Sequence, residues 1–305
     1  MTLPETIEHQ IAAIRADNSH GAAYLARRAT ETLSELAIET KPSSAAEFKA
    51  VVTAAGRALV AAQPTMAPLF NLVNEMLWRL DNLETPAASR NAVVDICRRF
   101  ADRLDRSNQA IAAEAVGLIA DGSTVLTYSA SATVLTSLKQ AYKAGQRFDV
   151  ICTESRPVGE GLELARELGR AGLRVSLVID AAVFRCLPAV QLVLVGADSL
   201  STGGLVNKIG TLGLAIAAQA FKVPGYALCS STKFLPTEYE PPPEPAKDPA
   251  EIVADPPDQV TILNYYFDRT PLTYLAGVVT EAGRLSVGEV GQQLGQLKCH
   301  PALKL

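Results

Sequence analysis

Residues 149–198 read DVICTESRPVGEGLELARELGRAGLRVSLVIDAAVFRCLPAVQLVLVGAD. Short apolar runs in this stretch alternate with helical patterns. The apolar runs cover residues 149–152, 174–179 and 192–195, and the helical patterns cover residues 159–171 and 181–187. Apolar strands with a helix between each pair are typical of a parallel sheet covered by helices on both faces. The stretch therefore predicts an α/β fold built on a parallel sheet.

The alternation continues on both sides of this stretch, and a different pattern precedes it. Further apolar runs lie at residues 124–127, 226–229 and 260–263, with helical patterns at 131–144 and 208–221. Before residue 120, apolar residues recur at spacings of three and four. These helical stretches cover residues 7–14, 22–36, 48–62, 69–80 and 108–119, the last ending before Asp121-Gly122. We expect a helical N-terminal domain at residues 1–120 and a parallel-sheet domain at residues 121–305.

The composition excludes several classes of function. The formal net charge of −4 argues against direct nucleic-acid binding, because contacts to a phosphate backbone need a basic surface. The five cysteines are scattered, and with only three histidines they predict free thiols and no metal site. The N-terminus does not resemble a signal peptide, and no run of about 18 apolar residues occurs. We expect a cytoplasmic protein that makes no membrane contact.

One segment stands apart in composition. Residues 238–258 read EYEPPPEPAKDPAEIVADPPD, rich in proline and in acidic residues. Such a segment is typical of a solvated surface loop or linker. The alternative is a proline-recognition motif, for which the sequence offers no further support.

Polar residues follow the first two strands of the predicted sheet. Ser131 begins a helix after the first strand, where it can cap the helix or share the helix N-terminus with a phosphate. Arg156 follows the second strand and precedes Pro157. Its guanidinium can bind a phosphate through two hydrogen bonds or pair with Glu154. Because the carboxyl ends of parallel strands meet at one edge of a sheet, ligands bind there.

Further polar residues follow the later strands. Asp198 comes directly after an apolar strand, where burial can raise its pKa toward the range useful for proton transfer. Asn207 and Lys208 are expected to open the helix at 208–221, and Lys233 follows the fifth strand. The spacing of the glycines before Lys208 differs from that of a P-loop, so we expect neither an ATPase nor a cofactor. Together with Arg156, the two lysines predict a site for a small anion.

Several stretches resemble one known family. They are TESRPVGEGLELARELGRAGLRVSLVID, VGADSLSTGGLVNKIGT, STKFLP, QPTMAPLFNLVNEML, SHGAAYLARRA and NYYFDRTPLTYLAGVVTEAG. They are similar to the alpha, beta and delta subunits of translation initiation factor 2B. The same family includes ribose-1,5-bisphosphate isomerase and methylthioribose-1-phosphate isomerase. The resemblance covers nearly the whole chain, and the stretch at residues 195–211 is the most specific part.

The resemblance implies a helical domain, a Rossmann-like C-terminal domain, and dimers formed largely through the latter. The isomerases of the family use an Asp, which matches Asp198, and a Cys, whose position is occupied by Ser129. The preceding His of that motif is replaced by Tyr128, and an Arg of the family is replaced by Gln63. The ligand-binding positions implied by the match are Gly21, Ala22, Gln63, Ser131, Arg156, Asn207, Lys208 and Lys233.

Two hypotheses about function follow. In the first, the chain binds a phosphorylated sugar or nucleotide, has a regulatory role, and contacts a second copy of itself or initiation factor subunits. In the second, it is an aldose–ketose isomerase in which Asp198 and Ser129 are the catalytic pair. Serine is a poor substitute for a thiol, because an unassisted alcohol does not exchange protons near neutral pH. Cys152, after the neighbouring strand, is the remaining thiol that could reach the site.

Overall fold

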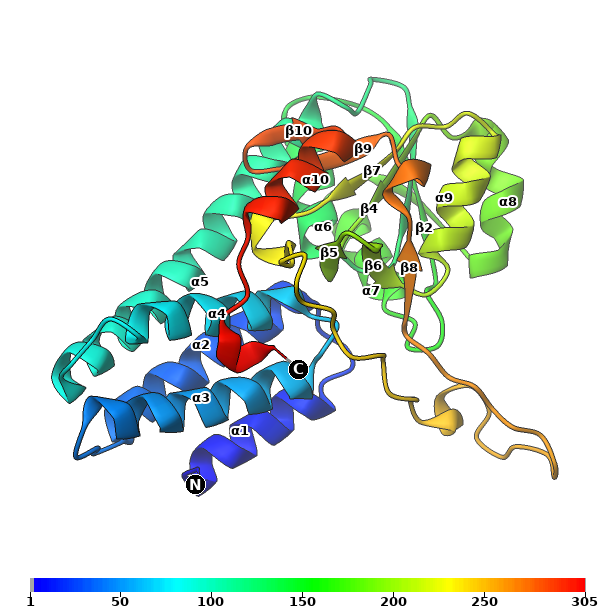
Figure 1. Cartoon of the computed structure of the whole chain (residues 1–305). Helices are drawn as coiled ribbons and strands as arrows, with labels where there is room; N and C mark the ends of the chain where they lie inside the picture. Colours follow the sequence, from blue (N-terminus) through cyan, green and yellow to red (C-terminus); the bar gives the residue numbers. More distant parts are fainter. Residues whose placement is uncertain (1–2, 305) are drawn as a thin grey trace.

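Five helices form the N-terminal region of the computed structural model, which describes residues 3–304 (Figure 1). They are α1 Glu5–Ala16, α2 Ala22–Glu39, α3 Ala45–Ala62, α4 Ala67–Leu80 and α5 Pro86–Val116. Their apolar stripes meet in one core that includes Leu33, Phe48 and Phe70. At the crossing of α3 and α4, a Cβ on Gly56 would lie 2.5 Å from Cγ1 of Val73. The two helices pack this closely because residue 56 has no side chain.

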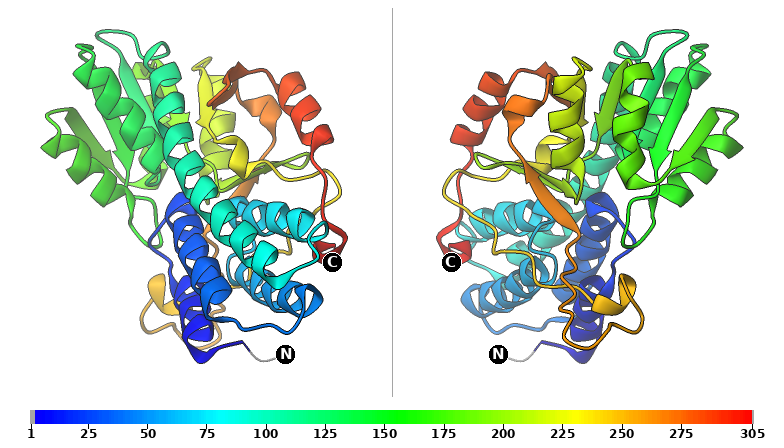
Figure 2. Two further views of the ribbon diagram at one scale, coloured as in Figure 1. Left: turned by 90° about the vertical axis from the view of Figure 1, so that its left-hand side faces the viewer. Right: turned by 90° about the vertical axis from the view of Figure 1, so that its right-hand side faces the viewer.

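The helix expected at residues 108–119 is the second half of α5, which has 31 residues. The prediction missed its first half, in which Val93, Ile96, Cys97 and Phe100 recur at spacings of three and four. Val93 and Phe100 pack in the helical core, whereas Ile111 packs against the sheet. Helix α5 therefore links the two parts of the molecule as one continuous element (Figure 2).

A seven-stranded sheet forms the second part, with strand order β10-β9-β7-β4-β1-β2-β3. All neighbours in it are parallel except β9 and β10. The strands are β1 Thr124–Tyr128, β2 Asp149–Thr153, β3 Arg174–Val178, β4 Leu192–Val195, β7 Gly225–Leu228, β9 Gly277–Thr280 and β10 Gly283–Leu285. A helical N-terminal region followed by a mostly parallel sheet confirms the predicted α/β class.

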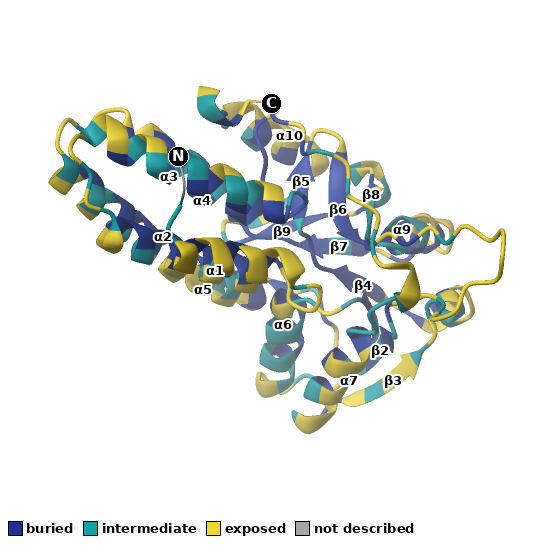
Figure 3. Ribbon diagram, turned by 90° about the horizontal axis from the view of Figure 1, so that it is seen from below, coloured by how far each residue is buried: buried dark blue, intermediate teal, exposed yellow. Residues whose placement is uncertain are grey.

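Helices cover both faces of this sheet, as the uninterrupted apolar strands predicted. The end of α5 packs on one face with α6 Ala132–Lys143 and α7 Gly161–Arg170. The opposite face is covered by α8 Val183–Cys186, α9 Thr211–Ala220 and α10 Val287–Gln296. The edge strand β3 is more exposed than the central strands, and Leu177 on it is 43% exposed (Figure 3).

A small antiparallel sheet corrects two of the predictions. It consists of β5 Ser199–Ser201, β6 Gly204–Lys208 and β8 Phe267–Thr270. Asn207 and Lys208 therefore end a strand and do not open a helix, because α9 begins only at Thr211. Residues 260–263 are not a strand. The partner of β6 is β8, about 60 positions later in the chain, and local sequence patterns do not reveal such a distant pairing.

Two segments connect the parts of the molecule. Residues 238–266 form a long loop that contains only the short 3₁₀ turn Pro249–Glu251 and extends from the body of the molecule (Figure 1). The C-terminal segment returns to the helical region, where His300 Nε2 lies 2.9 Å from Asp81 Oδ2. No helix among the described residues combines the length and the apolar character that crossing a membrane requires.

Candidate functional site

A cavity of about 540 Å³ lies at the carboxyl ends of β1 and β4. Parallel neighbours end at the same edge of a sheet, so the residues that follow these two strands face one another. The N-terminus of α2 and the end of α3 contribute to the wall from the helical region. The cavity therefore lies between the two parts of the chain, at the sheet edge where the sequence placed an anion site.

The N-terminus of α2 faces the cavity. Gly21 is its N-cap and offers no side chain to cap the N–H groups of the first turn. The backbone N–H of Ala22 donates a hydrogen bond to the carboxylate of Asp198. Gln63 also lines the cavity, but its Nε2 donates to the carbonyl oxygens of Ile14 and Asp17, at 2.8 and 3.0 Å. Gln63 thus holds the end of α1 in place beside the helix N-terminus.

Asp198 is held between the sheet and the helical region. Its backbone N–H donates to the carbonyl of Val206 at 2.9 Å, and its carbonyl accepts from Ala67 at 3.1 Å. Burial raises the pKa of its carboxyl to about 6, although the ammonium groups of Lys233 and Lys208 oppose the shift. At neutral pH this carboxyl therefore exchanges a proton readily. Lys233 is buried, and its ammonium donates to the carbonyl of Ala197 at 2.5 Å.

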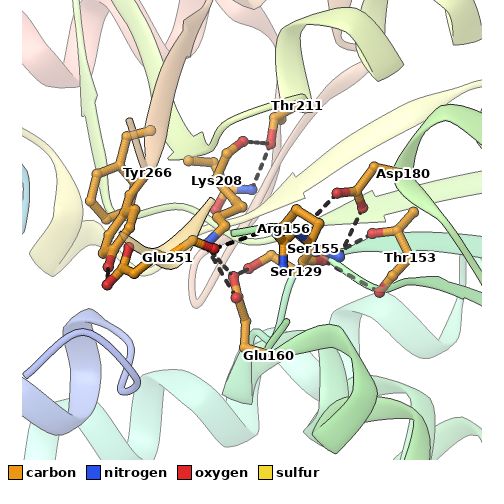
Figure 4. A network of polar contacts seen from close by, with 12 residues as sticks. Ser129, Thr153, Ser155, Arg156, Glu160, Asp180, Lys208, Thr211, Glu251 and Tyr266 are labelled. Atoms are coloured by element: carbon orange, nitrogen blue, oxygen red, sulfur yellow. Dashed lines mark hydrogen bonds and ion pairs between the residues drawn. The ribbon is translucent and has the colours of Figure 1, made fainter. Parts of the chain in front are cut away.

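A buried ion pair crosses the cavity floor (Figure 4). The ammonium of Lys208 lies 2.9 Å from Oε1 of Glu160, and the hydroxyl of Ser129 donates to the same oxygen at 2.7 Å. Ser129 has a φ of +66°, a backbone conformation uncommon outside glycine, and its N–H donates to the hydroxyl of Ser155. The serine hydroxyl, at the position where the resemblance implies a thiol in the isomerases, is thus bound to a carboxylate.

Ser131 and Asn207 complete the inner wall. The hydroxyl of Ser131 caps α6 by accepting from Val134 at 3.4 Å, and it also lines the cavity. A Cβ on Gly196 would lie 2.7 Å from that hydroxyl, so the close approach of the two chains requires glycine here. The amide of Asn207 donates to the hydroxyl of Thr211 at 3.0 Å. The structure thus shows Ser131 as the cap of α6, and its contact with a phosphate stays a prediction.

Arg156 does not line the cavity. Its guanidinium donates to the carbonyl oxygens of Glu251 and Ile252, at 3.1 and 3.4 Å (Figure 4). Its backbone N–H donates to the carboxylate of Asp180 at 2.8 Å. The structure thus places Arg156 outside the predicted anion site, and among the described residues it does not form the alternative ion pair with Glu154. Arg156 is drawn away because the long loop 238–266 passes beside it and offers unpaired carbonyl oxygens.

Several cavity residues were missed by the sequence analysis. Glu160 precedes α7, and its position after the second strand was the available signal. His20 pairs with Asp17 at 2.8 Å and stacks on Tyr24. Lys247 and Tyr266 come from the loop 238–266 and its end, where no local sequence pattern predicts a site.

Among the described residues, neither the thiols nor Tyr128, the last residue of β1, supplies a second group that exchanges protons at this cavity. Cys152 and Cys229 are fully buried outside the cavity wall, and burial raises the pKa of each to about 12. Tyr128 is also buried, and burial together with the carboxylates of Asp180 and Asp268 raises its pKa far above the usual value. Of the cysteines in residues 3–304, none lines this cavity.

Comparisons with known proteins agree with this geometry. A family model described as the initiation factor 2 subunit family matches residues 18–287. A ribose 1,5-bisphosphate isomerase from Methanocaldococcus jannaschii is 32% identical over 271 residues, covering 86% of each chain. A putative translation initiation factor eIF-2B subunit 2-like protein from Pyrococcus horikoshii is 30% identical, covering 92% of this chain and 96% of that one.

A solved structure shares the architecture as well. The crystal structure of the translation initiation factor eIF-2B from Pyrococcus horikoshii OT3 superposes with a TM-score of 0.82 at 30% identity. The match covers 93% of this chain and 98% of that one. The helical region and the sheet are therefore arranged as in that protein, with the cavity between them.

Proposed function

Because the chain belongs to the initiation factor 2 subunit family, we propose that its cavity binds a phosphorylated sugar or nucleotide and that its role is regulatory. Relatives of the chain include both initiation factor subunit-like proteins and sugar-phosphate isomerases. The family alone does not decide between binding and catalysis. The side chains in the cavity favour binding.

One observation carries the proposal of a phosphorylated ligand. The open N-terminus of α2, the ammonium groups of Lys233 and Lys208, and the hydroxyl of Ser131 all line the same cavity. Helix N-termini bind phosphate because their N–H groups lack partners and carry a partial positive charge. Hydrogen bonds from an ammonium to phosphate are charge-assisted and roughly twice as strong as neutral ones. Asp198 fits beside a phosphate because its pKa of about 6 lets it accept a proton from the ligand.

The regulatory role is proposed on chemical grounds. Aldose–ketose isomerisation requires two groups that exchange protons at the substrate. Asp198 can supply one, whereas the hydroxyl of Ser129 already donates to the carboxylate of Glu160. An alcohol in that position does not replace a thiol at neutral pH.

A thermal-shift series tests the proposed ligand class. Ribose 1,5-bisphosphate, methylthioribose 1-phosphate and AMP are each added to the native chain and to the Lys233→Ala variant. A ligand at 100 times its Kd stabilises the native state by about 2.7 kcal/mol. We expect at least one of the three to raise the Tm of the native chain, with a smaller rise in the variant. Unchanged melting of the native chain with all three would contradict the proposal.

The second candidate is an isomerase that acts on ribose 1,5-bisphosphate with Asp198 as acid and base. It is favoured by the pKa of Asp198 and by the similarity to the Methanocaldococcus enzyme. Turnover in the ordinary enzyme range, about 1–10³ per second, that disappears in Asp198→Asn would support this candidate. Turnover at background level would support the binding role.

We further propose that the chain forms a homodimer or an assembly of dimers. Large apolar side chains are exposed near the β3 edge and on α8, where Ile179 is 60% and Phe184 53% exposed. With Leu177, which is 43% exposed, they are apolar side chains that a partner subunit would cover. A role beside initiation factor subunits fits the same surface, because such subunits resemble this chain.

A further inference from the structure

The loop 238–266 contributes to the wall of the cavity. The sequence indicates a solvated connection, but Lys247 from this loop lies in the wall together with Lys208 and Lys233. The side chain of Lys247 is only 19% exposed. A lysine in a proline-rich surface loop would ordinarily extend into solvent, so its burial needs a cause.

Hydrogen bonds within the loop hold Lys247 in this position. The carboxylate of Glu244 accepts from the backbone N–H groups of Tyr266 and Phe267, at 3.1 and 3.2 Å. Asn264 donates to the carbonyl of Asp248 at 2.7 Å, and the N–H of Lys247 donates to the carbonyl of Asn264 at 3.1 Å. The two ends of the loop are thus tied together around the lysine.

Two further contacts fix the outer part of the loop (Figure 4). The hydroxyl of Tyr266 donates to the carboxylate of Glu251, and Arg156 donates to the carbonyl oxygens of Glu251 and Ile252. Residues 244–252 are therefore held beside the cavity by contacts from Tyr266, which precedes β8, and from Arg156, which follows β2.

The ammonium of Lys247 is incompletely neutralised. It lies 4.8 Å from the centroid of the Tyr266 ring, and the ammonium of Lys208 lies 4.9 Å from the same centroid. Lys208 has Glu160 at 2.9 Å, whereas the ion pair of Lys247 among the described residues is with Glu244 at 3.8 Å. That carboxylate is already bound by two N–H groups. An anion in the cavity would complete the hydrogen bonds of Lys247 and reduce the repulsion between the two lysines.

We propose that Lys247 forms a second anion subsite, with Tyr266 as the platform that positions its ammonium. The inference rests on the proposed function, in which a first phosphate lies at the N-terminus of α2 beside Lys233. The ligand class that satisfies both subsites is a sugar with two phosphate groups. A monophosphate occupies the first subsite and leaves Lys247 unsatisfied.

Calorimetric titration with two ligands tests this assignment. Ribose 1,5-bisphosphate and ribose 5-phosphate are titrated into the native chain, the Lys247→Gln variant and the control Lys41→Gln, whose side chain is exposed outside the cavity. We expect Lys247→Gln to weaken bisphosphate binding about tenfold or more, since a charge-assisted contact is lost, and to change ribose 5-phosphate binding less than twofold. Lys41→Gln should leave both affinities unchanged.

The other outcomes separate the two proposals. If the native chain binds the bisphosphate and Lys247→Gln binds it equally well, the second subsite is wrong and the proposed function survives. If Lys247→Gln weakens the binding of both ligands equally, Lys247 contacts the first phosphate, and the proposed second subsite is wrong. A native chain that binds neither ligand overturns the sugar-phosphate function and the subsite with it.

Limited trypsin digestion gives an independent readout. Between Lys233 and Arg269, Lys247 is the single Lys or Arg in the sequence. Cleavage after it yields a fragment that begins at Asp248. Saturating ribose 1,5-bisphosphate should slow this cleavage in the native chain, because the ligand holds the lysine away from the protease. Equal cleavage rates with and without the bound bisphosphate would contradict the assignment.

Discussion

Replacing Asp198 by asparagine should stabilise the unliganded protein at neutral pH. The pKa of this carboxyl is about 6 in the folded chain, against an ordinary value of 3.8. One pKa unit corresponds to about 1.4 kcal/mol, so keeping the carboxylate ionised at pH 7 costs the folded state at most about 3 kcal/mol. Because the carboxyl is only half-buried at the cavity, water offsets part of this cost. We expect Asp198→Asn to raise the free energy of unfolding by about 1–3 kcal/mol.

The pH dependence gives the sharper test. A raised folded-state pKa means that the native chain binds the proton more tightly than the unfolded chain. The cost is therefore absent below about pH 4, grows between about pH 4 and 6, and stays constant at higher pH. Urea unfolding of the native chain and of Asp198→Asn across this pH range measures the difference in free energy of unfolding. The control is Asp258→Asn, at an exposed position. A variant less stable at pH 7, or an advantage that does not change with pH, would refute the reasoning.

Three further predictions concern catalysis, packing and assembly. Turnover of ribose 1,5-bisphosphate by the native chain should be near background, and Ser129→Cys should raise it. If Ser129→Cys is as inactive as the native chain, the replacement of the family's Arg by Gln63 also contributes to the loss of activity. Gly56→Ala should lower the free energy of unfolding by about 1–2 kcal/mol in urea titrations, since the added Cβ meets Val73, and should be neutral or stabilising in a Val73→Ala background. Light scattering should give twice the mass of one chain, falling to one chain in Ile179→Lys; a native monomer at micromolar concentration would remove the proposed dimer.

The sequence predicted the elements whose signals are local. The central strands β1, β2 and β4 were found within one residue because each is a short run rich in apolar and β-branched residues. Strand β6 was misassigned because its partner β8 lies far away in the chain, and pairing of this kind decides whether a short segment becomes a strand. The first half of α5 was missed although Val93, Ile96 and Phe100 recur in it at spacings of three and four.

The site residues that follow or end a strand were predictable from the sequence. Asp198, Lys208 and Lys233 follow or end separate strands, and the fold brings them to one cavity. Arg156 satisfies the same rule and is nevertheless drawn to the loop 238–266. Side-chain direction depends on which partners lie nearby, and a loop without periodic pattern gives no information on where it passes. Lys247 was missed for the same reason.

The central claim is that the cavity holds a phosphate at the N-terminus of α2. A crystal structure of the chain grown with ribose 1,5-bisphosphate tests it most directly. The account predicts one phosphate within hydrogen-bond distance of the backbone N–H of Ala23 and of the Lys233 ammonium, at about 2.7–3.2 Å. Electron density for the ligand elsewhere on the chain, with the helix N-terminus occupied by water, would contradict it.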